Sequence, residues 1–143
     1  MEKRFSVAVL ISGRGSNLKS LIDNQSDYSI VGVFSDNPDA GGQVFAREAS
    51  IPFYALQRKD FPSKQEFLGA LLRQVEATKP DLIALAGFMR IVPAWFVESH
   101  FGRLVNIHPA LLPKFPGLDT HERALAAKET KHGCTVHFVD SGV

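Results

Sequence analysis

Residues 6–17 read SVAVLISGRGSN, an apolar run followed directly by a glycine-rich turn. The run is short, rich in β-branched residues and lacks alternation, which is typical of a strand buried on both faces of a parallel sheet. After the turn, residues 17–23 place Leu18, Leu21 and Ile22 on one face of an expected helix. A buried strand, a tight turn and an amphipathic helix in this order predict the beginning of an α/β fold.

The rest of the chain continues the alternation of strands and helices. The helix at 63–78 is the clearest, because Ser63 can cap it and Pro80 marks its end. We therefore expect a single domain over residues 1–143, with a mostly parallel open sheet, helices on its flanks and right-handed crossovers. Further strands or extended segments are expected at 30–35, 52–56, 81–86, 104–107 and 135–139, and further helices at 40–49, 93–100 and 120–128.

The bulk properties describe an ordinary globular protein. The chain has 143 residues, of which 45% are apolar and 22% charged, and its formal net charge is +1. This balance gives no support for a nucleic-acid or membrane partner. Cys134 is the only cysteine, so no internal disulfide can form, and no segment is long enough to span a bilayer. We expect a cytoplasmic protein.

The turn Gly13-Arg14-Gly15-Ser16-Asn17 is a candidate anion site. Glycines let the backbone approach a ligand, the N–H groups of a helix start favour phosphate, and the Ser16 and Asn17 side chains can add donors. No Gly-Lys-Ser/Thr of a Walker loop is present, and Leu18 occupies the third glycine position of a dinucleotide fingerprint, although Asp36 suits such a site. The turn alone leaves two interpretations open, a single-phosphate site or a plain βα turn capped by Ser16 or Asn17.

A second candidate site follows the expected strand at 104–107. Asn106 and His108 fall on the same side of that strand, where an amide and an imidazole can polarise a carbonyl and hold an oxyanion. Taken alone, they fit a polar strand end bonded to nearby backbone better than a catalytic pair. No pair of residues has metal-ligand spacing, and Cys134 suits a small buried residue better than a nucleophile. The weaker histidine candidates are His100 and His132, expected at the surface, His121 at a helix start and His137 within a strand.

Three motifs resemble those of one enzyme family. ISGRGSNL (residues 11–18) closely resembles the amino-terminal motif of glycinamide ribonucleotide formyltransferases, and LAGFMRI (residues 85–91) resembles their central motif. NIHPALLPKFPG (residues 106–117) is similar to the signature shared by formyltransferases that use 10-formyltetrahydrofolate. The resemblance covers the whole chain and implies a Rossmann-like formyltransferase fold of which this chain is the amino-terminal portion.

The resemblance also implies roles for residues. Gly15, Ser16 and Asn17 would bind the ribose phosphate of glycinamide ribonucleotide, while Asn106 and His108 would flank the formyl carbon. The substrate amine would attack that carbon, Asn106 and protonated His108 would stabilise the oxyanion, and a proton would pass to the folate nitrogen through His108 or water. Neither a metal nor a nucleotide triphosphate is required, because the formyl group is already activated.

The folate co-substrate would lie in a pocket formed mostly by backbone. The resemblance places Met89, Arg90, Ile91 and Val92 along it, next to Asn106. Lys64 stands where the family often has an arginine near the folate; an ammonium supplies the charge but not the bidentate fork of a guanidinium.

The resemblance further implies a catalytic aspartate after the last strand, at the position directly after Val143, with further strands and a helix beyond. We therefore expect the 143-residue chain by itself to have little or no formyltransferase activity. We also expect a cis peptide within residues 111–116, most readily before Pro113, and a monomer or homodimer.

Two alternatives remain at this stage. The first is another formyltetrahydrofolate enzyme, such as a methionyl-tRNA formyltransferase or a formyltetrahydrofolate hydrolase, which share the Asn-x-His-Pro signature but differ in the amino-terminal loop. The second is a ligand-binding module or inactive fragment that keeps a folate or phosphate pocket without turnover. Product formation distinguishes this second alternative from an active enzyme.

Overall fold

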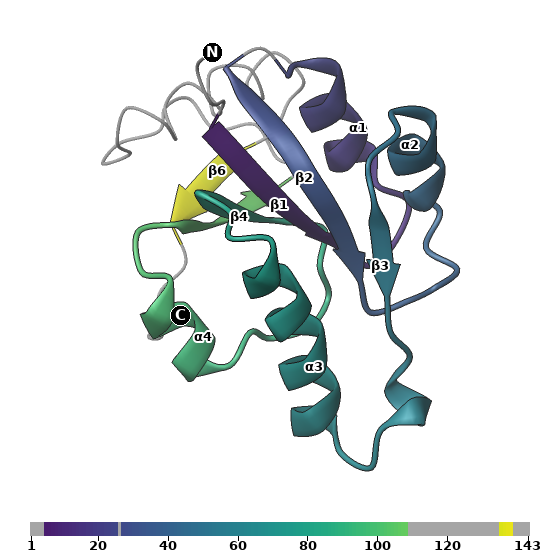
Figure 1. Cartoon of the computed structure of the whole chain (residues 1–143), viewed down its shortest axis with the longest axis vertical. Coiled ribbons are helices and arrows are strands. Elements are labelled where there is room, and N and C mark those ends of the chain that lie inside the picture. The colour runs from purple at the N-terminus through teal and green to yellow at the C-terminus, as the bar shows by residue number, and fades with distance from the viewer. Residues whose placement is uncertain (1–4, 26, 109–134, 139–143) are drawn as a thin grey trace.

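The chain folds around one six-stranded sheet with the strand order β3-β2-β1-β4-β5-β6 (Figure 1). This computed structural model describes residues 5–25, 27–108 and 135–138, and only the backbone of His108 and of 135–138. The first five strands are parallel, and β6 joins β5 in the antiparallel direction. The predicted mostly parallel α/β fold is therefore confirmed. The strands are β1 (Phe5–Ile11), β2 (Tyr28–Ser35), β3 (Phe53–Ala55), β4 (Leu82–Ala86), β5 (Leu104–His108) and β6 (Thr135–Phe138).

Helices cover both faces of the sheet (Figure 1). The helices α1 (Ser16–Asp23) and α2 (Gln43–Glu48) pack on one face, and α3 (Lys64–Ala77) and α4 (Ala94–Ser99) pack on the other. Within β1, Val7, Val9 and Ile11 face the first layer, whereas Ala8 and Leu10 face the second. All five are fully buried, which explains why the first strand reads as a continuous apolar run.

Several predicted boundaries need correction. Ser63 caps α3 as expected, since its Oγ accepts a hydrogen bond from the Glu66 N–H at 3.1 Å. Pro93, predicted inside the first turn of α4, is instead the extended residue before it, with ψ at 152°. α2 begins at Gln43 rather than at residue 40, and the short 3₁₀ helix η1 (Arg58–Asp60) was not predicted. The expected helix at 120–128, the 111–116 loop with its cis peptide, and Cys134, His121 and His132 lie outside the described residues.

The strand order defines the place where ligands bind in such sheets. From β1 the chain moves outward through β2 to β3, and then crosses to the other side of β1 to form β4 and β5. The connections after β1 and β4 therefore leave in opposite directions, which opens a crevice at the carboxyl ends of these strands. All three sequence motifs follow β1, β4 or β5, three neighbours in the sheet. Within the described part of the chain, no helix is both long and apolar enough to cross a membrane.

Candidate functional site

The glycine turn after β1 enters α1 without a side-chain cap. Gly15 occupies the cap position with φ 77° and ψ 29°, in the left-handed region that glycine adopts without strain. The interpretation in which Ser16 or Asn17 caps the helix is therefore wrong: both lie within the first turn of α1. Because no side-chain oxygen covers the start of α1, its backbone N–H groups and the positive end of the helix dipole stay open to the crevice, as an anion site requires.

A second pair of glycines holds this turn in place. The Gly42 N–H donates to the Gly13 carbonyl at 3.0 Å. A Cβ on Gly15 would lie 2.7 Å from the Gly42 Cα, and a Cβ on Gly42 would lie 3.1 Å from the Gly15 Cα. The turn thus packs backbone to backbone against the segment before α2. Sequence reasoning missed Gly42, because Gly41-Gly42 lies in what was expected to be the first turn of a helix.

Asn17 connects the first motif to the third. Its side chain is buried, 8% exposed, and its Nδ2 donates to the Ile107 carbonyl at 3.4 Å. The Asn17 side-chain amide, which was predicted to donate to a phosphate, thus already donates a hydrogen bond within the protein. Ser16, in contrast, is exposed at the start of α1.

The segment 87–92 after β4 is tied to the end of β1. The Ser12 N–H donates to the Gly87 carbonyl at 3.2 Å, and the Met89 N–H donates to Ser12 Oγ at 2.8 Å. Phe88 and Val92 pack against the core on the α3 side of the sheet. Met89 and Ile91 project outward, with 79% and 82% of their surfaces exposed. Of the four residues predicted to line a folate pocket, only these two have freely accessible side chains.

The Arg90 side chain turns into the protein. Its Nε donates to Asp36 Oδ2 at 2.8 Å, and its guanidinium carbon lies 4.7 Å from the centre of the Phe67 ring. The Asp36 side chain is 9% exposed and that of Arg90 26%. Asp36, which suited a dinucleotide site in the sequence, instead pairs with an arginine of the central motif.

Asn106 lies at the middle of β5, half-buried on the α3 side. It pairs in register with Leu85 of β4, which in turn neighbours β1 at Leu10. His108 ends β5, so the strand extends one residue beyond its predicted end. The side chain of His108 lies outside the described part, and so does the predicted approach of the two side chains. On the other side, the β6 backbone places His137 opposite Asn106.

Lys64 lies at the start of α3 beside a groove of about 520 Å³. This α3–α4 groove is lined by Lys64, Gln65, Leu68, Pro93 and Trp95. Pro93, the residue directly after the 87–92 segment, lines this groove together with Lys64. Its apolar walls and single cationic edge suit an elongated ligand that ends in an anionic group.

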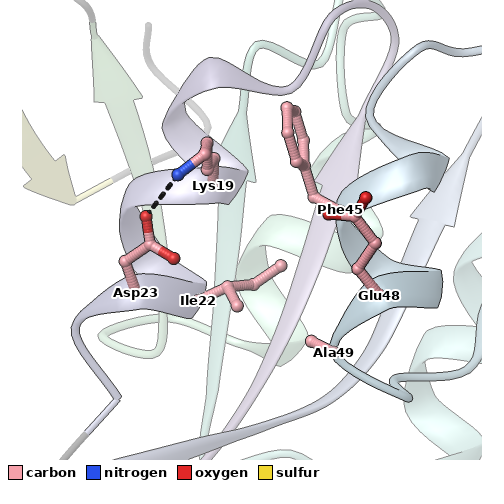
Figure 2. A pocket seen from close by; sticks show the side chains of 6 residues that line it. All are labelled: Lys19, Ile22, Asp23, Phe45, Glu48 and Ala49. Atoms are coloured by element: carbon pink, nitrogen blue, oxygen red, sulfur yellow. Dashed lines mark hydrogen bonds and ion pairs between the residues drawn. The ribbon is translucent and has the colours of Figure 1, made fainter.

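A smaller hollow of about 190 Å³ separates α1 from α2 (Figure 2). Ile22 projects from α1 and Phe45 from α2, and the Lys19 Nζ pairs with Asp23 Oδ2 at 2.7 Å on its rim. None of the predicted site residues lines this hollow.

His100 corrects a further prediction, since it is not a surface residue. Its side chain is 12% exposed, and its Nε2 lies 2.9 Å from Glu76 Oε2 of α3. The packing of α4 against α3 buries it beside the Phe96 ring, whose centre lies 4.4 Å away. Among the described residues, no group of three or more His, Cys, Asp or Glu side chains could hold a metal ion.

Comparison with known proteins identifies the class of protein to which this fold and its three neighbouring motifs belong. The formyl transferase family model matches residues 5–143, and the chain belongs to this family. The phosphoribosylglycinamide formyltransferase of Escherichia coli is 44% identical over 138 residues, which are 94% of this chain and 65% of the E. coli protein. The trifunctional purine biosynthetic protein adenosine-3 of Drosophila melanogaster is 49% identical over 148 residues, 99% of this chain but 11% of that protein.

Solved structures agree with these relatives. The phosphoribosylglycinamide formyltransferase of Brucella melitensis has a TM-score of 0.77 and 46% identity, over 98% of this chain and 75% of that one. The corresponding enzyme of Coxiella burnetii has a TM-score of 0.75 and 44% identity, over 97% of this chain and 67% of that one. The chain thus spans about two thirds to three quarters of these phosphoribosylglycinamide formyltransferases and about a tenth of the trifunctional protein.

Proposed function

We propose that the protein containing this sequence transfers a formyl group from 10-formyltetrahydrofolate to the amine of glycinamide ribonucleotide, a step of purine biosynthesis. One observation carries the proposal beyond family membership. The turn after β1, the segment after β4 and the end of β5 meet at the switch point of the sheet, joined by the Ser12–Met89 and Asn17–Ile107 hydrogen bonds. A phosphate-bearing amine and a folate bound to neighbouring segments would meet at Asn106.

The phosphate end of the amine substrate would bind at Gly15–Asn17. The uncapped start of α1 supplies N–H donors and the positive end of the helix dipole. The Gly13–Gly42 hydrogen bond holds this backbone in shape before a ligand arrives, which lowers the entropic cost of binding. Ser16 adds a hydroxyl at the exposed start of the helix.

The reaction would take place beside Asn106 and His108. The amine nitrogen attacks the formyl carbon, and the carbonyl oxygen becomes an oxyanion that the Asn106 amide and the protonated His108 imidazole stabilise. The bond between the formyl carbon and folate nitrogen then breaks. The proton lost by the amine passes to that nitrogen through His108 or water. This account needs no metal ion.

The folate would lie along residues 89–92 and extend into the α3–α4 groove. Since the Arg90 side chain points into the protein, Arg90 would contact the folate through its backbone, as would Val92. The exposed side chains of Met89 and Ile91 provide apolar surface. Lys64, at the edge of the groove, would face the carboxylates at the far end of the folate.

The decisive assay uses the natural protein that carries this sequence, with 10-formyltetrahydrofolate and one acceptor at a time. We expect formylated product with glycinamide ribonucleotide, and none with methionyl-tRNA. Formyl transfer to tRNA, or release of formate without an acceptor at a comparable rate, would identify one of the other formyltetrahydrofolate enzymes. Folate binding without any product would identify a binding module.

The same assay tests the role of His108. We expect His108→Ala to lower turnover by about 10²–10³, because one group that stabilises the oxyanion is removed. The variant should retain the thermal unfolding midpoint of the unmodified protein. Lys59→Ala, in the exposed helix η1, provides a control that should keep full turnover. Turnover of His108→Ala near that of the control would remove His108 from the mechanism.

A further inference from the structure

The side chain of Arg90 provides a connection that neither the family assignment nor the proposed reaction uses. Successive side chains of the 87–92 segment alternate in direction: Phe88, Arg90 and Val92 point toward the protein, whereas Met89 and Ile91 are exposed. Phe88 and Val92 make apolar contacts. Arg90 alone of the three makes a directional contact, at the middle of the segment.

The partner of Arg90 comes from a distant part of the sheet. Asp36 follows β2, and β1 lies between β2 and β4. The Arg90–Asp36 ion pair therefore spans β1 at the carboxyl edge of the sheet. With 9% of the Asp36 side chain exposed, solvent screens this pair far less than a surface pair. Asp36 Oδ1 is buried and has no partner among the described residues, so the carboxylate is held through Oδ2.

Phe67 adds a second contact from α3. Its ring lies under the Arg90 guanidinium carbon at 4.7 Å, in a cation–π arrangement, and is itself fully buried. Phe61, which directly follows η1, packs against the Phe67 ring, and the two ring centres lie 5.7 Å apart. Arg90 is thereby fixed against α3, the helix whose first turn carries Lys64 and Gln65 of the α3–α4 groove.

We propose that Asp36 and Phe67 are positioning residues of the folate site, which act through the Arg90 side chain to hold the backbone of residues 89–92. This inference rests on the proposed function, because it takes that backbone to be a wall of the folate pocket. Neither residue touches the ligand. Their effect is to set the segment in its binding conformation before the folate arrives.

The test is Asp36→Asn in the natural protein, with the two substrates titrated separately. The substitution keeps the shape of the side chain and one acceptor oxygen but removes the charge. We expect KM for 10-formyltetrahydrofolate to rise on the order of tenfold, while KM for glycinamide ribonucleotide changes less than about twofold. Asp23→Asn is the matched control, since it makes the same change in the exposed Lys19–Asp23 pair. It should leave both constants unchanged.

A double-mutant cycle separates a positioning role from a general loss of stability. Arg90→Met keeps the apolar stem and removes the guanidinium. If Asp36 acts through Arg90, the Asp36→Asn/Arg90→Met double variant should have nearly the same folate KM as either single variant. Arg90→Lys should recover part of the loss, because it restores the charge without the planar group. If Asp36→Asn does not fold, Phe67→Leu should show the same selective rise in folate KM.

The outcomes are distinct. A selective and non-additive rise in the folate KM supports the inference. It is overturned if Asp36→Asn matches Asp23→Asn, if both substrate constants rise in proportion, or if the two substitutions act additively. If the unmodified protein forms no product from 10-formyltetrahydrofolate, the proposed function is wrong, and the inference that rests on it is wrong as well. A working enzyme with an unaffected Asp36→Asn variant overturns the inference alone.

Discussion

At the scale of single residues, the two glycines of the turn after β1, Gly13 and Gly15, contribute differently to the candidate site. Gly15 needs the left-handed conformation to start α1 directly after β1, and its missing side chain lets Gly42 approach. Gly13, two residues earlier, has open space where a Cβ would stand. The two glycines of the turn therefore have different roles, although the motif alone does not distinguish them.

This difference can be measured by unfolding. We expect Gly15→Ala to destabilise the protein by about 2 kcal/mol or more, since left-handed backbone costs an L-residue roughly 1–2 kcal/mol and the new methyl would meet the Gly42 backbone. Gly13→Ala is the control and should change the free energy of unfolding by less than about 0.5 kcal/mol. Urea denaturation of both variants gives the comparison, and equal effects would contradict the proposed contact.

At the scale of elements, residues near the helix ends determine where the helices begin, and packing against the sheet determines their orientation. α3 begins at the Ser63 cap and buries Phe67, Leu71 and Val75 against the sheet. Because its first turn carries Lys64 and Gln65, the same cap holds one wall of the α3–α4 groove. α1 is positioned differently, by Gly15 at its start and by Asn17 against β5.

Removal of the α3 cap should therefore affect stability by a predictable amount. We expect Ser63→Ala to lower the free energy of unfolding by about 1 kcal/mol, because the Glu66 N–H loses its acceptor. Ser99→Ala serves as a control, since the exposed Ser99 hydroxyl donates to the Trp95 carbonyl of its own helix and does not cap a helix start. Thermal melts of the two variants are sufficient, and an undestabilised Ser63→Ala would show that the cap is dispensable.

The Lys19–Asp23 pair on α1 has a predictable pH dependence. Its hydrogen bond and the Asp23 charge raise the pKa of Lys19 above the ordinary value. The small stabilisation from this pair is therefore present below the pKa of an unfolded lysine and is lost as the pH rises through the folded pKa of Lys19. Asp23→Asn should lower the Lys19 pKa in an NMR titration. Glu48→Gln, on the facing helix in Figure 2, should lower it less, because Glu48 acts only through a weaker charge interaction. An equal decrease in both variants would contradict this assignment.

At the scale of the whole molecule, the strand order assembles the site. The crossover from one side of β1 to the other brings the ends of β1, β4 and β5 together, and side-chain hydrogen bonds then join their loops. Both layers of helices contribute, α1 with its start and α3 with the groove. The proposed phosphate and folate regions therefore lie on opposite faces of the sheet and meet at its carboxyl edge.

This arrangement predicts where a simple anion binds. In an NMR titration with inorganic phosphate, we expect the largest amide shifts at Gly15, Ser16 and Asn17, because the start of α1 has no side-chain cap. The start of α3 is the internal control, since Ser63 already caps it. Shifts that are largest at Lys64 and Gln65, or at neither helix, would exclude the turn as the phosphate site.

The sequence by itself determined the parts that depend on near neighbours. The apolar run at 6–12 indicated a strand buried on two faces, and Ser63 indicated the start of α3; the three motifs indicated the family. Burial pattern and capping are properties of short segments, so they can be predicted without knowing the partners. The same reasoning misplaced Pro93 and the start of α2, where the boundary depends on how the chain turns rather than on which residues are apolar.

Only the tertiary structure decided which distant residues hold the site. The Arg90–Asp36, Ser12–Met89 and Asn17–Ile107 contacts join residues 54, 77 and 90 positions apart. No periodicity or local propensity relates such pairs, because their distance in space follows from strand order and crossovers. For the same reason, the sequence around Asp36 indicated only a possible dinucleotide site. Its pairing with Arg90 follows from the order of β2, β1 and β4 in the sheet, which the sequence does not show.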